Sequence, residues 1–425
     1  MSVTKEIYEA YINILREELV PAMGCTEPIA LAYAAAKARE VLGQLPEKIR
    51  VDASGSIIKN VKSVIVPNTN HLKGIGAAVA AGAVAGDASK ELEVIANVSD
   101  EEIEEIKKFL EETPIEISCA DSGLTFDIKV TMYKGEHTSV VRIANYHTNV
   151  VLVKKDEEVL VDIPVMDESE EGLTDRSIMN MRDICEFVDM VDISDVREII
   201  DRQIRYNTAI AEEGMKNDYG ANIGKVLLKS EGDTVRTRAK AMAAAGSDAR
   251  MNGCEMPVII NSGSGNQGIT CCMPVIEYAK EYKVSEEKLY RALVLSNLVA
   301  IYQKSGIGRL SAYCGAVSAG AAAGAGIAYI QGYGYVEIKH TVVNALAIVS
   351  GMVCDGAKAS CAAKIAMAVD AGILGFEMYR NGQQFYGGDG IVAKGVDATI
   401  KNVGCLGKDG MKETNQTIID MMMRC

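Results

Sequence analysis

The segment from Leu310 to Val336 constrains the fold most strongly, because it contains no charged side chain. As a helix it would be long enough to span a membrane. However, it consists mainly of Ala, Gly and Ser, which gain little free energy on transfer to lipid but allow two helices to approach closely. We therefore predict a buried helix in a closely packed helical domain rather than a membrane span.

The charge balance of the chain excludes several classes of partner. Its 425 residues include 58 Asp and Glu against 44 Lys and Arg, a formal net charge of −14. Binding to nucleic acid or to an anionic membrane requires a basic surface, so we expect neither as a partner. The N-terminal residues mix acidic and basic side chains at helical spacing and do not resemble a signal peptide, so we expect a cytoplasmic protein.

The pattern of side chains divides the chain into three parts and predicts an α+β fold. Residues 1–44 predict two helices that pack on the C-terminal domain. Residues 45–165 predict an α+β domain, with one charged surface helix at Asp100–Glu112. After an acidic linker at Met166–Asp175, residues 176–425 predict a mainly helical domain rich in small residues. The predicted strands are Lys48–Asp52, Ser63–Val66, Glu91–Val98, Ile115–Cys119, Phe126–Tyr133, Ser139–Asn145 and Val150–Val153.

A glycine-rich loop at Asn261–Gly268 contains the pattern G-x-G-x-x-G. In a Rossmann fold this pattern binds a dinucleotide, but no alternating strands and helices surround it here. Backbone N–H groups at a helix N-terminus also hold small anions such as a carboxylate. We predict such a site, with Arg250 as a nearby cation; a plain turn, with Arg250 in a salt bridge, is the competing interpretation. The side chains expected to contribute are Ser262, Ser264, Asn266 and Gln267.

The chain contains eleven cysteines, and without a secretory signal we do not expect a disulfide framework. Cys314, Cys354 and Cys361 lie in segments that also contain glycine. The last two are spaced to share a helix face, although Asp355-Gly356 could instead bend the chain around a metal. By spacing alone, three buried core cysteines are the favoured interpretation.

Two further polar positions are candidates. Cys25 lies between two predicted helices, where a thiol at a helix N-terminus ionises more easily and can act as a nucleophile, base or ligand. A cysteine buried in a turn is the alternative. His147, one of only four histidines, is followed by Thr148 and Asn149, which suggests a polar site. A structural histidine satisfied by its neighbours competes with that interpretation.

Taken together, six segments resemble the L-cysteine desulfidase family, which is related to the catalytic part of iron–sulfur L-serine dehydratases. The resemblance spans nearly the whole chain in the same order. The segments are GCTEP at 24–28, SDAR at 247–250, NSGSGNQGIT at 261–270, RLSAYCGA at 309–316, GMVCDGAKASC at 351–361 and GGDGIVAKGV at 387–396.

The resemblance implies an oxygen-sensitive [4Fe-4S] cluster and conversion of L-cysteine to sulfide, ammonia and pyruvate without pyridoxal phosphate. By the same resemblance, Cys314, Cys354 and Cys361 are the cluster ligands. The glycine-rich loop would hold the substrate carboxylate, and the segment from His147 to Asn149 would lie at the substrate. Cys25 matches a family cysteine that is either a ligand or an acid–base group, and Cys25 and His147 are the candidates for the base that removes the Cα proton.

One departure separates the two related families. The dehydratases space the last two cluster cysteines more widely than Cys354 and Cys361, which favours the desulfidase and makes L-serine the less expected substrate. Three thiolates also leave one iron of a cubane open, and a soft iron prefers sulfur to a hydroxyl. A serine dehydratase and a non-catalytic cluster or thiol sensor are the alternatives, and a homodimer is expected from the small-residue helix faces.

Overall fold

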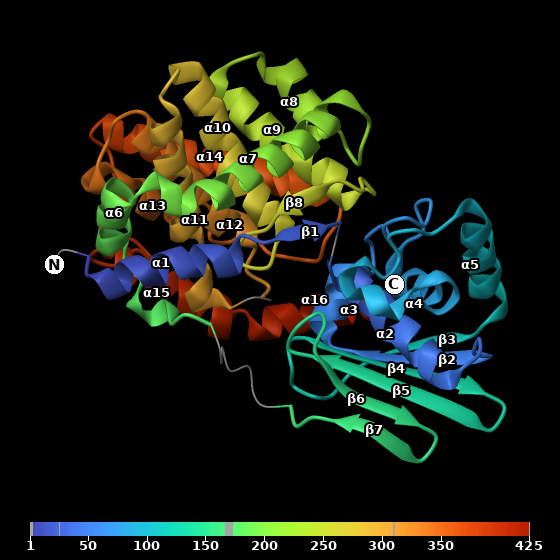
Figure 1. The fold of residues 1–425 in the computed structure, drawn as a ribbon. Coiled ribbons are helices and arrows are strands. Elements are labelled where there is room, and N and C mark those ends of the chain that lie inside the picture. Colours follow the sequence, from blue (N-terminus) through green and yellow to red (C-terminus); the bar gives the residue numbers. More distant parts are fainter. Residues whose placement is uncertain (1–2, 25, 166–172, 309–310, 425) are drawn as a thin grey trace.

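The structure is a computed structural model that describes residues 3–24, 26–165, 173–308 and 311–424. It confirms the predicted α+β class: a sheet domain from the N-terminal part of the chain lies beside a larger, mainly helical domain (Figure 1). Cys25 and most of the predicted linker at Met166–Asp175 lie outside the described residues.

The sheet domain is built on a six-stranded sheet with the order β3-β2-β4-β5-β6-β7. β2 and β3 are parallel, and the other neighbours are antiparallel. The helices α2 (Thr26–Leu42) and α4 (Gly74–Ala85) cover one face, where their alanines pack with the strand residues to form one core. The strands are β2 (Lys48–Ala53), β3 (Ile115–Cys119), β4 (Asp127–Lys134), β5 (His137–Ala144), β6 (Val150–Lys155) and β7 (Glu158–Asp162).

Two of the predicted strands are wrong. Ser63–Val66 forms only an isolated bridge between Ile65 and Lys73. Glu91–Val98 overlaps the 3-10 helix η1 (Ala88–Glu93) and continues as turns, with Glu91 at a φ of 48°. A left-handed residue interrupts an extended chain, so this segment cannot join the sheet despite its β-branched residues. The charged helix predicted at Asp100–Glu112 is confirmed as α5, which Ser99 and Glu102 begin with a capping box.

The helical domain packs its helices around α12 (Gly315–Ile330), which is buried along nearly its whole length. The prediction of a buried small-residue helix is therefore confirmed. None of the helices in the described part of the chain is long and apolar enough to cross a membrane. The other helices are α1 (Lys5–Glu18), α6 (Met181–Met190), α7 (Ile193–Lys216), α8 (Ile223–Glu231), α9 (Val235–Met251), α10 (Gly265–Tyr282), α11 (Glu286–Ile307), α13 (Tyr335–Val349), α14 (Ser360–Arg380), α15 (Val396–Cys405) and α16 (Lys412–Arg424), with short helices η2 (Arg176–Ile178) and η3 (Leu406–Gly410).

The two N-terminal helices belong to different cores. Tyr11, Ile14 and Leu15 of α1 are buried in the core of the helical domain, whereas α2 belongs to the core of the sheet domain. Residues 1–44, which we expected to pack together on the C-terminal domain, are therefore shared between the two domains. The short strand β1 (Pro21–Met23) lies between these helices and pairs with β8 (Pro257–Ile259) of the helical domain.

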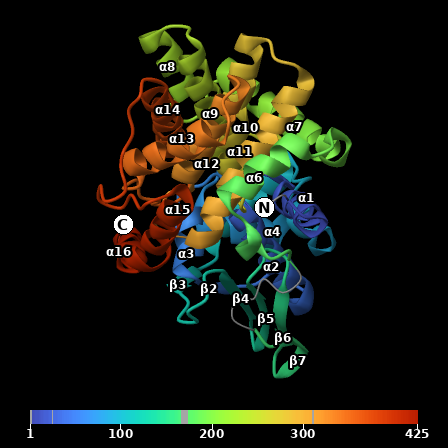
Figure 2. The same ribbon diagram turned by 90° about the vertical axis from the view of Figure 1, so that its left-hand side faces the viewer.

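The C-terminal helix α16 returns to the sheet domain and packs on α3 (Gly55–Val61), as both views show (Figure 2). The Lys59 ammonium on α3 donates a hydrogen bond of 2.7 Å to Asn415 Oδ1 on α16. Ile419 of α16 lies against Gly55 at the start of α3. These contacts, with the β1–β8 pair, fix the two domains against each other and so position the residues between them.

Close approach of α12 and α14 gives a first prediction. A Cβ added at Gly372 would lie 2.2 Å from the carbonyl oxygen of Gly320, on the facing helix. Gly372→Val is therefore expected to push the helices apart and to destabilise the protein by about 3 kcal/mol, measured by denaturant unfolding. Gly351→Ala is the control, because no described atom lies within 4 Å of the added Cβ. Equal stabilities for the two variants would contradict this packing argument.

Candidate active site

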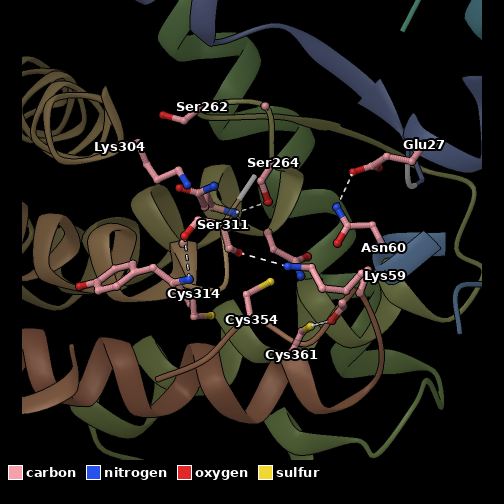
Figure 3. Close-up of a pocket in the computed structure, with 18 of the residues that line it drawn as sticks. Glu27, Lys59, Asn60, Ser262, Ser264, Lys304, Ser311, Cys314, Cys354 and Cys361 are labelled. Carbon is pink, nitrogen blue, oxygen red and sulfur yellow. Dashed lines mark hydrogen bonds between the residues drawn. The ribbon is translucent and has the colours of Figure 1, made fainter. Parts of the chain in front are cut away.

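A cavity of about 180 Å³ lies between the two domains (Figure 3). The sheet domain supplies α2, α3 and the loops around Phe126 and His147. The helical domain supplies the glycine-rich loop, α11 and the segments that carry three cysteines. Of the predicted site residues, the cavity is lined by His147, Arg250, Ser262, Ser264, Asn266, Gln267, Cys314, Cys354 and Cys361.

Backbone pairing brings Cys314 and Cys354 together. Tyr313 and Val353 form an antiparallel bridge. The Cys314 N–H donates to the Met352 carbonyl at 3.1 Å, and the Cys354 N–H donates to the Ala312 carbonyl at 2.6 Å. Since Cys354 precedes α14, it does not share a helix face with Cys361, and the alternative of a bend at Asp355-Gly356 is the one the structure adopts.

Gly356 makes that bend and sets the position of Cys361. It has a φ of +94°, and a Cβ there would lie 2.1 Å from the Lys59 carbonyl oxygen. Only glycine fits this close approach without strain. The chain then enters α14, whose first turn carries Cys361, and the Cys361 thiol lies 3.6 Å from the Gly356 carbonyl oxygen.

Two buried lysines face the cysteines, although the sequence analysis did not predict them. Burial lowers the pKa of Lys304 to about 8 and also lowers that of Lys59, whereas Cys314 and Cys354 act on both in the opposite direction. Burial raises the pKa of Cys314 to about 12, and Cys354 adds to this effect. Burial therefore favours the neutral form of the Cys314 thiol, and the buried ammonium groups add positive charge near it.

The anion-binding half of the cavity is built from α9 and the start of α10. Ser264 caps α10, since its hydroxyl accepts the Gln267 N–H at 3.4 Å. Arg250, at the C-terminal end of α9, donates from Nη1 to Asn266 Oδ1 at 3.3 Å. Ser262 donates its hydroxyl to Asn261 Oδ1 at 2.9 Å, which fixes the turn before α10.

Two polar atoms in this half have no hydrogen-bond partner among the described residues. They are Arg250 Nε and Gln267 Oε1, and both are buried in residues that line the cavity. Leaving such groups unpaired costs roughly 1–3 kcal/mol each, and more for a charged group. A donor and an acceptor held ready in this way suit a small polar ligand, such as the carboxylate and amine of an amino acid.

A salt bridge was the competing interpretation for Arg250, but Asp248 and Arg250 do not pair in the described structure. Its carboxylate accepts the Ile223 N–H at 2.7 Å and that of Ala221 at 3.4 Å, at the start of α8. Burial raises the pKa of Asp248 to about 6. The carboxylate therefore supports the α8 terminus and leaves the Arg250 guanidinium to the cavity.

His147 and its two neighbours have different positions. The His147 ring lines the cavity and packs edge-on against Phe126, with centroids 4.7 Å apart. Thr148 and Asn149 do not line it, and the Asn149 amide donates instead to the Ala144 carbonyl at 2.9 Å. The structure thus brings His147 to the other candidates but not Thr148 or Asn149, while Cys25 lies outside the described residues.

The cavity residues that the sequence analysis did not predict include the polar side chains of Glu27, Lys59, Asn60 and Lys304. The sequence did hold a signal for the lysines. Lys59 interrupts the apolar run of Gly55–Val61, and Lys304 ends a long apolar stretch of α11. A lysine on an otherwise buried helix is rare unless a partner or ligand compensates it.

The glycine-rich loop does not belong to a dinucleotide-binding fold. In the described chain β8, which precedes it, pairs only with β1 and runs antiparallel to it. A Rossmann unit needs a parallel β-α-β arrangement at this point. The dinucleotide interpretation is therefore excluded by topology.

Comparison with known proteins agrees with this arrangement. The family model described as serine dehydratase alpha chain matches residues 89–420. The chain belongs to this family. It is also similar over nearly its whole length to proteins named UPF0597 protein. These are 61% identical over 416 residues in Desulfitobacterium hafniense (98% of this chain, 97% of the relative), 52% over 417 in Lachnoclostridium phytofermentans (98% and 100%) and 47% over 430 in Treponema denticola (100% and 100%).

Members of the serine dehydratase alpha chain family are iron–sulfur dehydratases, so the protein is a dehydratase-related lyase. The cavity fits such a cofactor. Cys314, Cys354 and Cys361 all line it, and Cys314 interacts electrostatically with both other thiols. No three His, Cys, Asp or Glu side chains in the described ranges could hold one metal ion. In a cubane, however, each cysteine binds a different iron, so the three sulfurs need not converge on one point.

The surrounding charges also suit a cluster. Lys59 is buried beside the cysteines, and Lys364 acts on Cys314 and Cys361. Three thiolates bring three negative charges to a buried position, and nearby ammonium groups offset part of that charge. The donor set is therefore that of an iron–sulfur centre rather than of a calcium or magnesium site.

Proposed function

We propose that the protein is an iron–sulfur-dependent L-cysteine desulfidase, which converts L-cysteine to sulfide, ammonia and pyruvate. The observation that carries this proposal is that one cavity joins three cysteines to the unpaired polar groups of Arg250 and Gln267. A volume of about 180 Å³ suits a small amino acid. The same cavity offers thiol ligands and groups for a carboxylate.

The chain's own residues would hold the substrate. Arg250 would bind the carboxylate with its guanidinium, which Asn266 orients through a hydrogen bond. Ser262, Ser264 and Gln267 line the same cavity and can complete the binding of the carboxylate and amine. Fixing both ends of a small substrate directs its Cα–H bond toward one wall.

Cys314, Cys354 and Cys361 would hold a [4Fe-4S] cluster. When bound, the cluster would supply a Lewis acid that accepts charge from the sulfur of the substrate. Three protein ligands would leave one iron of a cubane without a cysteine, and the three cysteines line the cavity that would hold the substrate.

His147 is the proposed base within the described residues. It lines the cavity, and its contact with Phe126 restricts the ring. His147 would take the Cα proton while the Cβ–S bond breaks and its electron pair leaves with sulfur. The resulting aminoacrylate hydrolyses to pyruvate and ammonia. Cys25 is retained as a second proposed acid–base group or ligand from its motif, and Thr148 and Asn149 as residues that shape the His147 loop.

L-serine dehydration is the second candidate, and the description of the matching family favours it. Both reactions remove a Cα proton and a β substituent, so the same residues would serve either. The close spacing of Cys354 and Cys361 favours the desulfidase, because the resembling dehydratases space this pair more widely.

The test uses protein purified without oxygen. We expect iron and acid-labile sulfide in about equal amounts, with sulfide and pyruvate released from L-cysteine at a higher kcat/KM than pyruvate from L-serine. A higher kcat/KM for L-serine would identify a dehydratase. If the protein holds iron and labile sulfide but forms no product from either amino acid, the result would favour a non-catalytic cluster or thiol sensor. Protein that holds no iron after reconstitution would contradict the proposal.

Location and assembly are part of the same proposal. Reduced thiols persist in the cytoplasm, which we propose as the location. A homodimer also remains a proposal. The small-residue faces of α12 and α14 pack on each other within one chain, so a dimer would have to use other surfaces.

A further inference from the structure

Lys304 is a buried lysine for which the described residues provide no partner. It lies on α11, is 5% exposed and lines the cavity. Its ammonium makes no hydrogen bond or ion pair with any residue in the described part of the chain. Figure 3 shows its side chain among Ser262, Ser264, Ser311 and Cys314, on the wall of the cavity.

The other two buried lysines of the described chain are compensated. Lys59 donates to the Ser311 carbonyl at 3.3 Å and to Asn415 Oδ1 at 2.7 Å. Lys240 pairs with Glu231 at 2.6 Å and with Asp370 at 3.3 Å. Since a buried charge without a partner destabilises a folded protein, Lys304 is better explained by a ligand than by stability.

The charged and titratable groups that face Lys304 indicate what that ligand is. They are Cys354, Cys314 and Lys59. Lys304 and all three cysteines line the same cavity, and the substrate carboxylate already has a cation in Arg250. The remaining part of the substrate that gains negative charge during elimination is its sulfur.

We propose that the Lys304 ammonium is a catalytic group that binds the sulfur of the substrate as the Cβ–S bond breaks. This inference rests on the proposed function and adds a residue to it. As the bond breaks, its electron pair goes to sulfur, and the ammonium donates a hydrogen bond to the developing anion, which leaves as hydrosulfide. A donor directed at charge that appears only in the transition state raises kcat rather than substrate affinity.

The first test compares stabilities of cluster-free protein. Lys304→Met is expected to raise the midpoint of thermal unfolding by about 2 °C or more, because it removes an uncompensated buried charge. Lys59→Met is the matched control and should lower the midpoint, since it breaks the hydrogen bonds to Ser311 and Asn415. A lower midpoint for Lys304→Met would show that the lysine supports the fold and would overturn the proposal.

The pH dependence of that comparison has a definite sign. Burial lowers the pKa of Lys304 to about 8, below the ordinary value of 10.5 that the unfolded chain keeps. The unfolded state therefore binds more protons between these values, and the destabilisation is complete below about pH 8 and is relieved as pH rises further. The advantage of Lys304→Met should accordingly shrink from pH 8 to pH 10. An advantage that stays constant would contradict an ammonium without a partner.

The second test measures catalysis in protein with its iron restored. Lys304→Met should keep the iron and labile sulfide content of the wild type but lose about 10²-fold or more in kcat on L-cysteine, with KM changed far less. Lys304→Arg should recover part of the loss. Elimination from β-chloro-L-alanine should fall less, because chloride leaves readily without a donor.

The outcomes separate this inference from the proposed function. If the wild type forms no product from L-cysteine, both fail. Two results with an active wild type would overturn only the assignment of Lys304 to sulfur. One is a Lys304→Met variant with a changed KM and an unchanged kcat. The other is an equal loss of activity on L-cysteine and on β-chloro-L-alanine. Loss of iron from Lys304→Met would likewise overturn it, because the lysine would then serve the cluster.

Discussion

Cys354→Ser is expected to give a protein that is colourless after anaerobic reconstitution and releases no detectable sulfide from L-cysteine. Cys354 is held beside Cys314 by the hydrogen bonds of the Tyr313–Val353 bridge, so no other thiol can replace it without moving that backbone. A serine hydroxyl is a much harder ligand than a thiolate and ionises less easily, which disfavours binding to iron. Iron content and visible absorbance measure the result directly.

The control for this variant is Cys405→Ser. Cys405 is exposed at the end of α15 and does not line the cavity. It should retain the wild-type iron content and activity, which separates loss of a ligand from general sensitivity of the thiols to oxygen. Retention of a full complement of iron by Cys354→Ser would exclude Cys354 as a ligand and contradict the proposed cluster site.

The sequence predicts those elements whose signals are local. The dense charges of Asp100–Glu112 predict α5 with its observed bounds, and the uncharged small-residue stretch predicts the buried helix α12. Both follow from interactions between residues close in the chain. By contrast, nothing local distinguishes the alanines of α2, which join the sheet domain, from those that build the helical core.

The errors in the sheet domain have a similar origin. β-branched residues made Glu91–Val98 resemble a strand, but Glu91 adopts a left-handed conformation and the segment forms turns. The strand β7 was not predicted. It lies at the edge of the sheet and pairs only with β6, so its formation depends on that neighbour. Strand formation depends on what lies alongside, which the chain's local pattern does not contain.

The candidate site shows the same division. Motifs with several polar or cysteine residues in sequence could be found without a structure, and the cavity brings most of them together. Lys59 and Lys304 were missed because each is a single residue within an apolar helix. Their significance lies in their burial at the cavity, which depends on how the two domains meet.

Arg250→Met is expected to lower kcat/KM for L-cysteine by about 10²–10³-fold, mainly through KM. Arg250 is a cation that lines the cavity beside Asn266, and its Nε has no partner among the described residues. Loss of one member of a buried, hydrogen-bonded charge pair typically costs about 2–5 kcal/mol, which corresponds to this range. Because the carboxylate keeps its charge throughout the reaction, kcat should change little.

The substrate can be altered to match the variant. L-cysteinamide lacks the carboxylate, so the wild type should discriminate strongly against it, whereas Arg250→Met should treat the two substrates nearly alike. Arg250→Lys should restore only part of the discrimination, because an ammonium lacks the paired donors of a guanidinium. Arg50→Met is the control, since Arg50 lies on the exposed face of the sheet and pairs with Asp52. If Arg250→Met still prefers L-cysteine to its amide as strongly as the wild type does, the carboxylate binds elsewhere in the cavity.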